Sequence, residues 1–121
     1  MTVPAKWIVL FHEEFLREAE AFPSGARIGL AAMIEVLREL GPQLRRPHCD
    51  TLKGSQHANM KELRFGAADG VWRIAFAFDR SRRAILLAGG DKSGSSTVRF
   101  YKTLIRKADR RYMDWLKETK R

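Results

Sequence analysis

The feature that most restricts the fold of this chain is the alternation in VWRIAFAF, residues 71–78. Successive side chains of a strand point to opposite faces of a sheet, so this segment predicts a strand with one bulky face and one smaller, partly charged face. The bulky face carries Trp72, Ile74, Phe76 and Phe78. A strand of this kind needs other strands beside it and a layer of helices over its bulky face.

The first part of the chain predicts one strand and two helices. WIVLF, residues 7–11, is a short apolar run bounded by polar residues and predicts a buried strand. Residues 12–22 have apolar side chains at helical spacing, and Pro23 ends that pattern. Ser24 is placed to cap a second helix, which the GP pair at residues 41–42 ends.

A polar loop, residues 41–59, separates these helices from three further strands and a last helix. The strands are expected at KELRF (61–65), VWRIAFAF (71–78) and AILLA (84–88). The last helix has an apolar stripe of Tyr101, Leu104, Ile105, Ala108, Tyr112 and Trp115. The order is β-α-α-β-β-β-α. We therefore expect one α+β domain over residues 1–121, with a small antiparallel sheet, the two N-terminal helices packed on one face and a C-terminal helix.

The bulky faces of two adjacent strands set their register. If KELRF and VWRIAFAF form a hairpin, burying Leu63 and Phe65 with the bulky face of the second strand places Arg64 opposite Arg73. Two arginines that face each other repel unless an anion or an acidic neighbour lies between them. We therefore expect an open cationic face that suits phosphate. On such a face, truncation of Arg73 is expected to leave stability unchanged or slightly higher.

The charge of the chain is unevenly distributed. The net charge is +9, yet residues 1–40 contain four Lys and Arg against six Asp and Glu, and the later residues contain 19 against 8. This asymmetry favours a polyanionic partner, most simply nucleic acid, over a charge surplus that only maintains solubility. Cys49 is the single cysteine, and WIVLF is too short for a signal peptide or a membrane span, so we expect a cytoplasmic protein.

Four segments together carry a resemblance to a known family. They are LKGSQHANMKELRF (52–65), GVWRIAFAFD (70–79), AILLAGGDKSGSS (84–96) and RFYKTLI (99–105). With the order of elements, they resemble the RelE/ParE superfamily of bacterial toxins, especially its HigB-type and phage-derived branch. The resemblance implies a RelE-like fold and the toxin of a type II toxin–antitoxin module. RelE- and HigB-type members are mRNA interferases, endoribonucleases that cut mRNA on the ribosome, whereas ParE-type members inhibit DNA gyrase.

The resemblance also implies roles for individual residues. The matched positions are Arg73, which would hold the scissile phosphate, Lys61 and Arg64 in the family's basic strand, Lys92 after the apolar strand, and Tyr101 near a terminal tyrosine or histidine. Glu62 stands where the family carries a lysine, so the general base is unassigned. The candidates for base and acid in cleavage through the 2′-hydroxyl are His57, Lys61, Glu62, Lys92 and Tyr101. Since cations can stabilise the charge on phosphorus, we expect no metal and no cofactor.

Other motifs favour structural explanations. His48, Cys49, Asp50 and His57 match no standard zinc spacing, and Cys49 has no identified base that would make it a nucleophile. GGDKSG (89–94) lacks the lysine position of a P-loop. For the basic C-terminal helix, a solvated face is favoured over a nucleic-acid contact.

Two classes of function remain open from the residues. The first is a ribosome-dependent mRNA endoribonuclease, and the second is a non-catalytic protein, either a ParE-like gyrase inhibitor or an inactive nucleic-acid-binding relative. The arginine face favours the enzyme. The expected partners are a cognate antitoxin, a helix-turn-helix protein encoded nearby, and mRNA on the ribosome. Operator DNA is expected only through the antitoxin, and no membrane is expected.

Overall fold

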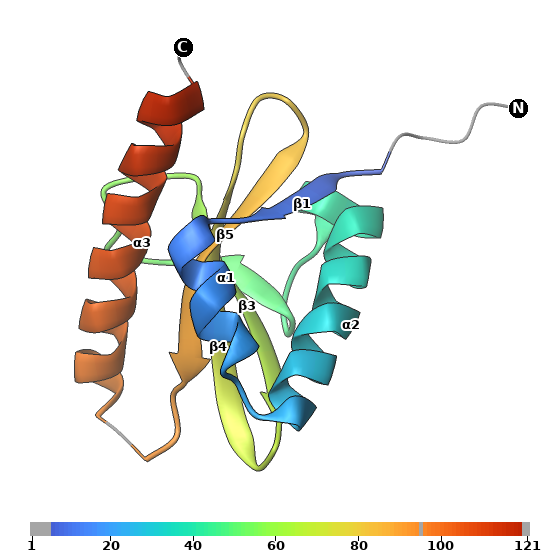
Figure 1. Ribbon diagram of the computed structural model, residues 1–121, viewed down its shortest axis with the longest axis vertical. Coiled ribbons are helices and arrows are strands. Elements are labelled where there is room, and N and C mark those ends of the chain that lie inside the picture. Colours follow the sequence, from blue (N-terminus) through green and yellow to red (C-terminus); the bar gives the residue numbers. More distant parts are fainter. Residues whose placement is uncertain (1–5, 95, 120–121) are drawn as a thin grey trace, which may run out of the picture.

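The computed structural model describes residues 6–94 and 96–119, which form one sheet with helices on both faces (Figure 1). The strands are β1 (Ile8–Phe11), β2 (Cys49–Thr51), β3 (Met60–Ala67), β4 (Gly70–Phe78) and β5 (Arg83–Asp91). The helices are α1 (Glu13–Glu20), α2 (Ser24–Leu40) and α3 (Thr97–Thr119), with a 3-10 turn η1 at Gly41–Gln43. The predicted α+β class and element order are confirmed, with the strand β2 added. The ends of the expected domain, residues 1–5 and 120–121, lie outside the described residues.

The sheet is mixed, with the strand order β1-β5-β4-β3-β2. The strands from β2 to β5 pair antiparallel, whereas β1 pairs parallel with β5. The expectation of a purely antiparallel sheet is therefore wrong for β1. Short loops impose antiparallel pairing only on the strands that they join. Since α1 and α2 separate β1 from the other strands along the chain, the local sequence does not specify its direction.

The predicted register between β3 and β4 is confirmed. The paired positions are Phe65 with Trp72, Leu63 with Ile74, and Arg64 with Arg73. A two-residue loop closes this hairpin, with φ angles of 50° at Ala68 and 59° at Asp69. Positive φ at both positions gives a turn whose twist matches that of the flanking strands. The two arginines therefore lie side by side on one face of the sheet.

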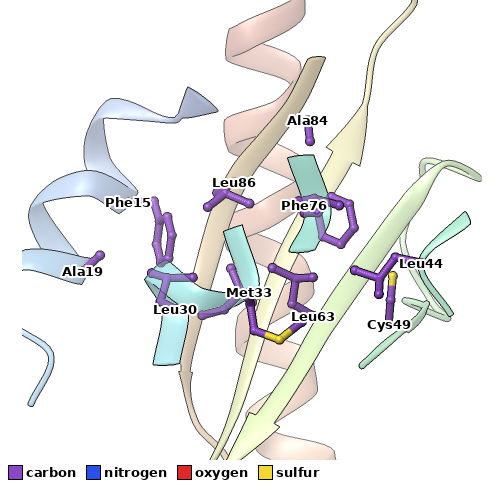
Figure 2. Close-up of a cluster of buried hydrophobic side chains, with 12 residues drawn as sticks. Phe15, Ala19, Leu30, Met33, Leu44, Cys49, Leu63, Phe76, Ala84 and Leu86 are labelled. Carbon is purple, nitrogen blue, oxygen red and sulfur yellow. The ribbon is translucent and has the colours of Figure 1, made fainter. Parts of the chain in front are cut away.

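One face of the sheet packs against α1 and α2 and holds the larger apolar core. Figure 2 shows Phe15, Leu30 and Met33 from these helices beside Leu63, Phe76 and Leu86 from the strands. The bulky side of β4 faces this cluster, as its alternation predicts. Cys49 of β2 lies at the same core, and burial raises the pKa of its thiol to about 11. The thiol therefore stays protonated, which agrees with the expectation that Cys49 is not a nucleophile.

The other face of the sheet packs against α3 (Figure 1). All six residues of the predicted apolar stripe of α3 lie in or against this second core. Ala75 pairs with Ala88 and Phe76 with Leu86, so Leu87 is an extra residue in β5 at a bulge. The small side chains of β4 on this face leave room for the helix. Neither α3 nor another helix of the described chain is long and apolar enough to cross a membrane.

Two local expectations need correction. Ser24 is the first residue of α2 rather than its cap, since Pro23 occupies the cap position without a side-chain hydrogen bond. The loop expected at residues 41–59 contains β2, which only three residues form, too few for a recognisable pattern. Gly41 ends α2 as predicted, with φ of 53°, and a Cβ there would collide with the indole of Trp7.

A buried arginine connects α3 to α1. Arg111 is 3% exposed and donates from Nη1 and Nη2 to the two carboxylate oxygens of Glu18, at 2.9 and 2.6 Å. Its Nη1 also donates to the backbone oxygen of Leu87, at 2.8 Å. These hydrogen bonds from Arg111 lower the pKa of Glu18 below its usual 4.5. The ionised carboxylate is therefore favoured by folding.

We expect the Glu18–Arg111 pair to make the free energy of unfolding depend on pH in the acidic range. Because the folded-state pKa of Glu18 is lowered, its contribution is present above about pH 4.5 and is lost as the pH falls through the folded value. Glu18→Gln should lower the free energy of unfolding at about pH 7, and the difference from wild type should shrink towards about pH 3. Urea unfolding of both proteins across this pH range measures the difference. Glu13→Gln is the control, because the exposed Glu13–Arg17 pair contributes about 0.5 kcal/mol or less. A pH-independent difference for Glu18→Gln would contradict the prediction.

Candidate active site

A buried charge cluster lies where α3 crosses β3 and β4. Glu62, Arg64 and Arg73 point to the α3 face of the sheet, because they alternate with Leu63 and Ile74 of the other core. Arg73 is 6% exposed and Glu62 is 5% exposed. The expected open cationic face is therefore wrong at Arg73. The reason is that the first turns of α3 cover this part of the sheet, which the strand pattern alone does not reveal.

Glu62 is the centre of this cluster. The Tyr101 hydroxyl donates to Glu62 Oε1 at 2.8 Å, and Arg73 Nε lies 3.6 Å from the same oxygen. Arg73 Nη1 donates to the backbone oxygen of Trp72 at 2.9 Å. Glu62 is thus an acidic neighbour that reduces the repulsion expected between Arg64 and Arg73. The hydrogen bond from Tyr101 and the ion pair with Arg73 fix the orientation of its carboxylate.

Tyr101 is held in its protonated form. Burial, and then the hydrogen bond to Glu62, raise the pKa of its hydroxyl above the usual value near 10, and Arg73 only partly opposes this. Lys92 Nζ lies 5.9 Å from the centre of the Tyr101 ring, within the range of a cation–π contact. Tyr101 is therefore a proton donor at neutral pH, and Lys92 places a positive charge against its ring.

A surface pocket of about 230 Å³ opens onto this cluster. Its lining residues are Arg46, Asp50, Thr51, Leu52, Lys53, Glu62, Arg64 and Tyr101. Arg46 Nη2 lies 2.8 Å from Asp50 Oδ2, and Arg64 Nη1 lies 4.0 Å from it. The hydrogen bond from Arg46 lowers the pKa of Asp50, which keeps the carboxylate ionised. The pocket thus combines two carboxylates, a phenol and three cations, whereas Arg73 lies behind Glu62 and does not line it.

Comparison with known proteins identifies the family. Residues 17–113 match the model of the phage-derived Gp49-like proteins (DUF891), which covers more than half of the chain. The chain belongs to this Gp49-like family.

Two relatives and one solved structure agree with this. A toxin named HigB2 of Mycobacterium tuberculosis (strain ATCC 25618 / H37Rv) is 49% identical over 70% of this chain, which spans only 42% of that relative's length. HigB3 of the same organism, also named as a toxin, is 45% identical over 83% of this chain and 79% of its own length. The free state of a mutant of the Escherichia coli toxin RelE has a TM-score of 0.60 and 14% identity, over 84% of this chain and 96% of that chain. The resemblance to the HigB-type branch of the RelE/ParE superfamily is confirmed.

Two predicted site residues of this Gp49-like protein lie away from the pocket. Lys61 points to the opposite face of the sheet from Glu62, because neighbouring residues of β3 alternate. His57 packs edge-on against Tyr112, with ring centres 4.8 Å apart. Tyr112 follows Tyr101 by three turns of α3, about 16 Å along the helix. The structure therefore brings together Glu62, Arg64, Arg73, Lys92 and Tyr101, and it separates Lys61 and His57 from them.

Arg46 and Asp50 belong to the pocket but were not among the predicted site residues. Their four-residue spacing is visible in the sequence, yet it becomes informative only once β2 is known to pair with β3. Asp50 then lies opposite Glu62, on the α3 face. Lys53 is the second residue after β2, and the same pairing places it at the pocket.

The residues considered for zinc do not form a site. Cys49 faces the α2 core, while Asp50 faces the pocket and pairs with Arg46. Among the described residues, three potential ligands that come within 4.8 Å of one another are His12, Glu14 and Asp114. Arg110 pairs with both of these carboxylates, at 3.0 and 3.3 Å, and His12 Nδ1 accepts the backbone N–H of Glu14. This group is therefore an ion-pair network with a helix cap.

Proposed function

We propose that this HigB-type toxin domain is an endoribonuclease that cuts mRNA on the ribosome. The observation that carries the proposal is the pocket in which Glu62, held by Tyr101 and Arg73, faces Arg64 and Lys53. A carboxylate, a proton donor and exposed cations in one pocket are the groups that RNA cleavage through the 2′-hydroxyl requires. A toxin that acted only through a protein surface would have no need of this combination.

In the proposed reaction Glu62 is the general base. It accepts the proton of the 2′-hydroxyl as that oxygen forms a bond to phosphorus. Tyr101 donates its proton to the 5′-oxygen as the phosphorus–oxygen bond breaks, which leaves a 2′,3′-cyclic phosphate and a 5′-hydroxyl. The proton then passes from Glu62 to the tyrosinate along their 2.8 Å hydrogen bond, and both groups return to their starting forms. This route assigns the base that the sequence leaves open.

The cations have separate roles in this proposal. Arg64 and Lys53 line the pocket and contact the non-bridging oxygens of the phosphate, where negative charge develops. The weak 4.0 Å contact with Asp50 leaves Arg64 able to turn towards a phosphate. Lys92 acts through the Tyr101 ring, where a positive charge helps the phenol to release its proton. Arg73 is a positioning residue, because it orients Glu62 from behind.

Induction of the full chain in cells tests the proposed activity. Mapping of mRNA 5′ ends should show cuts that appear with the protein and that require active translation. Glu62→Gln is the matched inactive chain. Growth arrest without new mRNA ends, and with accumulated gyrase–DNA breaks, would reject the nuclease and support the ParE-like alternative.

The partners follow from the family. A toxin of this type implies a cognate antitoxin, and we propose a small helix-turn-helix protein encoded nearby that covers the basic pocket and carries the toxin to operator DNA. Co-expression of the two genes should restore growth and give a stable complex. A chain that is harmless alone and recruits no neighbouring product would count against the assignment. We expect this activity in the cytoplasm, where ribosomes and mRNA meet.

We expect the chemical step to proceed without a divalent ion. The proposed base, acid and cations are all side chains, so no step depends on a Lewis acid. Ribosomes need Mg²⁺, so the measurement is single-turnover cleavage of a short RNA that the protein alone accepts, with and without chelator. The cleavage rates with and without chelator should agree within about twofold. Loss of cleavage on chelation and its return with added metal would contradict the prediction.

A further inference from the structure

The loop after β2 runs alongside α3. Lys53 and Tyr101 line the same pocket, and a Cβ on Gly54 would lie 3.3 Å from Ile105 Cδ1. One turn further on, Asp109 accepts from Ser55 Oγ at 2.5 Å and from the backbone N–H of Gln56 at 2.9 Å. Residues 52–57 are therefore fixed against the helix by a buried carboxylate rather than left free.

This arrangement leaves a groove of about 560 Å³ on the outer side of α3. Its lining residues are Gly54, Gln56, Lys102, Ile105, Arg106, Asp109, Arg110 and Met113. Lys102, Arg106 and Arg110 lie at intervals of four residues, which places successive cations about 6 Å apart along one side of the helix. The groove thus has a basic wall above an apolar floor at Ile105.

The groove lies next to the pocket along both segments that form it. Lys53 and Tyr101 line the pocket, and the next residue of each segment, Gly54 and Lys102, lines the groove. We therefore expect the first cation of the groove to be within reach of a strand whose phosphate sits beside Glu62. This adjacency distinguishes the groove from basic side chains elsewhere on the surface.

Two cations of the groove are free to bind. Arg110 pairs with Glu14 and Asp114, at 3.0 and 3.3 Å. By contrast, the side chains of Lys102 and Arg106 are exposed and form no ion pair or hydrogen bond with any residue in 6–94 or 96–119. The carboxylate of Asp109 accepts hydrogen bonds from Ser55 and Gln56, and it forms no ion pair with Lys102 or Arg106.

We propose that this groove binds the substrate RNA beyond the cleavage point, through backbone phosphates on Lys102 and Arg106. The proposal rests on the proposed function, and it adds where the strand runs. Since both cations contact phosphates and no base edge, this binding carries little sequence preference. It supplies affinity that depends on salt and on the length of the RNA.

Binding of uncleavable RNA tests the groove separately from the chemistry. Oligonucleotides with 2′-O-methyl groups lack the attacking hydroxyl, and a trinucleotide fills only the pocket whereas a dodecamer also reaches the groove. The variant is Lys102→Gln with Arg106→Gln. The matched control, Arg27→Gln with Lys117→Gln, removes the same charge from exposed positions outside both the pocket and the groove. Fluorescence anisotropy over a range of salt concentrations gives affinity and its salt dependence.

For the groove variant we expect the dodecamer to bind about 20-fold more weakly at about 0.1 M salt. The slope of the logarithm of the binding constant against the logarithm of the salt concentration should be smaller in magnitude by about 1.4, because each phosphate contact to a single strand contributes about 0.7. Trinucleotide binding should be unchanged, and the control should match wild type. An equal loss in the control, or an equal loss for the trinucleotide, overturns the proposal. Weaker binding to empty ribosomes with unchanged dodecamer binding also overturns the proposal, because the two cations would then bind ribosomal RNA rather than the substrate. Cleavage by Glu62→Gln would reject the proposed chemistry and leave this result intact.

Discussion

Glu62→Gln should lower the single-turnover rate of mRNA cleavage by about 10³-fold. The amide keeps the shape of the carboxylate and still accepts the hydrogen bond from Tyr101, but it leaves the buried Arg73 without its anion, so the melting temperature of the variant is measured before its rate. It does not accept the proton of the 2′-hydroxyl, and it does not return a proton to Tyr101 after cleavage. The measurement uses a single preparation of ribosomes with a defined mRNA, with the toxin in excess.

Two further variants make this result decisive. Glu35→Gln changes an exposed carboxylate on α2 that pairs with Arg38, and it should cleave like wild type. Tyr101→Phe removes only the hydroxyl, so it tests the same relay even if Glu62→Gln folds poorly, and a loss of about 10²-fold is expected. A folded Glu62→Gln protein with wild-type cleavage would show that the base lies elsewhere.

Arg73→Ala should lower the free energy of unfolding by about 3–5 kcal/mol. The substitution leaves the buried carboxylate of Glu62 without its cation, and it opens a space beneath α3. For a domain of this size the melting temperature should fall by about 12–20 °C. This reverses the expectation from the sequence, which treated Arg73 as solvated and its truncation as harmless. Thermal and urea unfolding of the full chain measure the change.

A double-mutant cycle separates the ion pair from other effects of Arg73. Arg73→Met leaves Glu62 unpaired and should destabilise, as Arg73→Ala does. Arg73→Met combined with Glu62→Met removes both charges and should recover most of the lost stability, since two well-packed apolar residues are often as stable as a buried pair. A melting temperature of Arg73→Ala equal to that of wild type would mean that the guanidinium is solvated. A double variant as unstable as the single one would show that the pair is not the cause.

The sequence predicted the site unevenly, and particular residues show why. Glu62, Arg64 and Arg73 could be placed on one face, because strand alternation and the bulky positions of both strands determine the register. The same alternation was sufficient to exclude Lys61 from the site, because Lys61 is the neighbour of Glu62 in the strand and therefore lies on the opposite face of the sheet. His57 lies in a loop, where no periodicity relates its position to the sheet. Arg46 and Asp50 were missed because β2 is too short to recognise.

The amino-acid sequence by itself determined the α+β class, the register of the β3–β4 hairpin and the apolar stripe of α3. These features depend on contacts between near neighbours or on a period of two or 3.6 residues, which the order of side chains states directly. Only the tertiary structure decided that β1 runs parallel to β5, that α3 covers Arg73, and that Tyr101 meets Glu62 across 39 residues of chain. Those outcomes depend on how distant elements pack. The apolar stripe of a helix shows which of its own residues are buried, but it does not show which side chains of other elements they contact. The candidate pocket is such a meeting of distant elements, so the sequence supplied some of its residues but not the contacts between them.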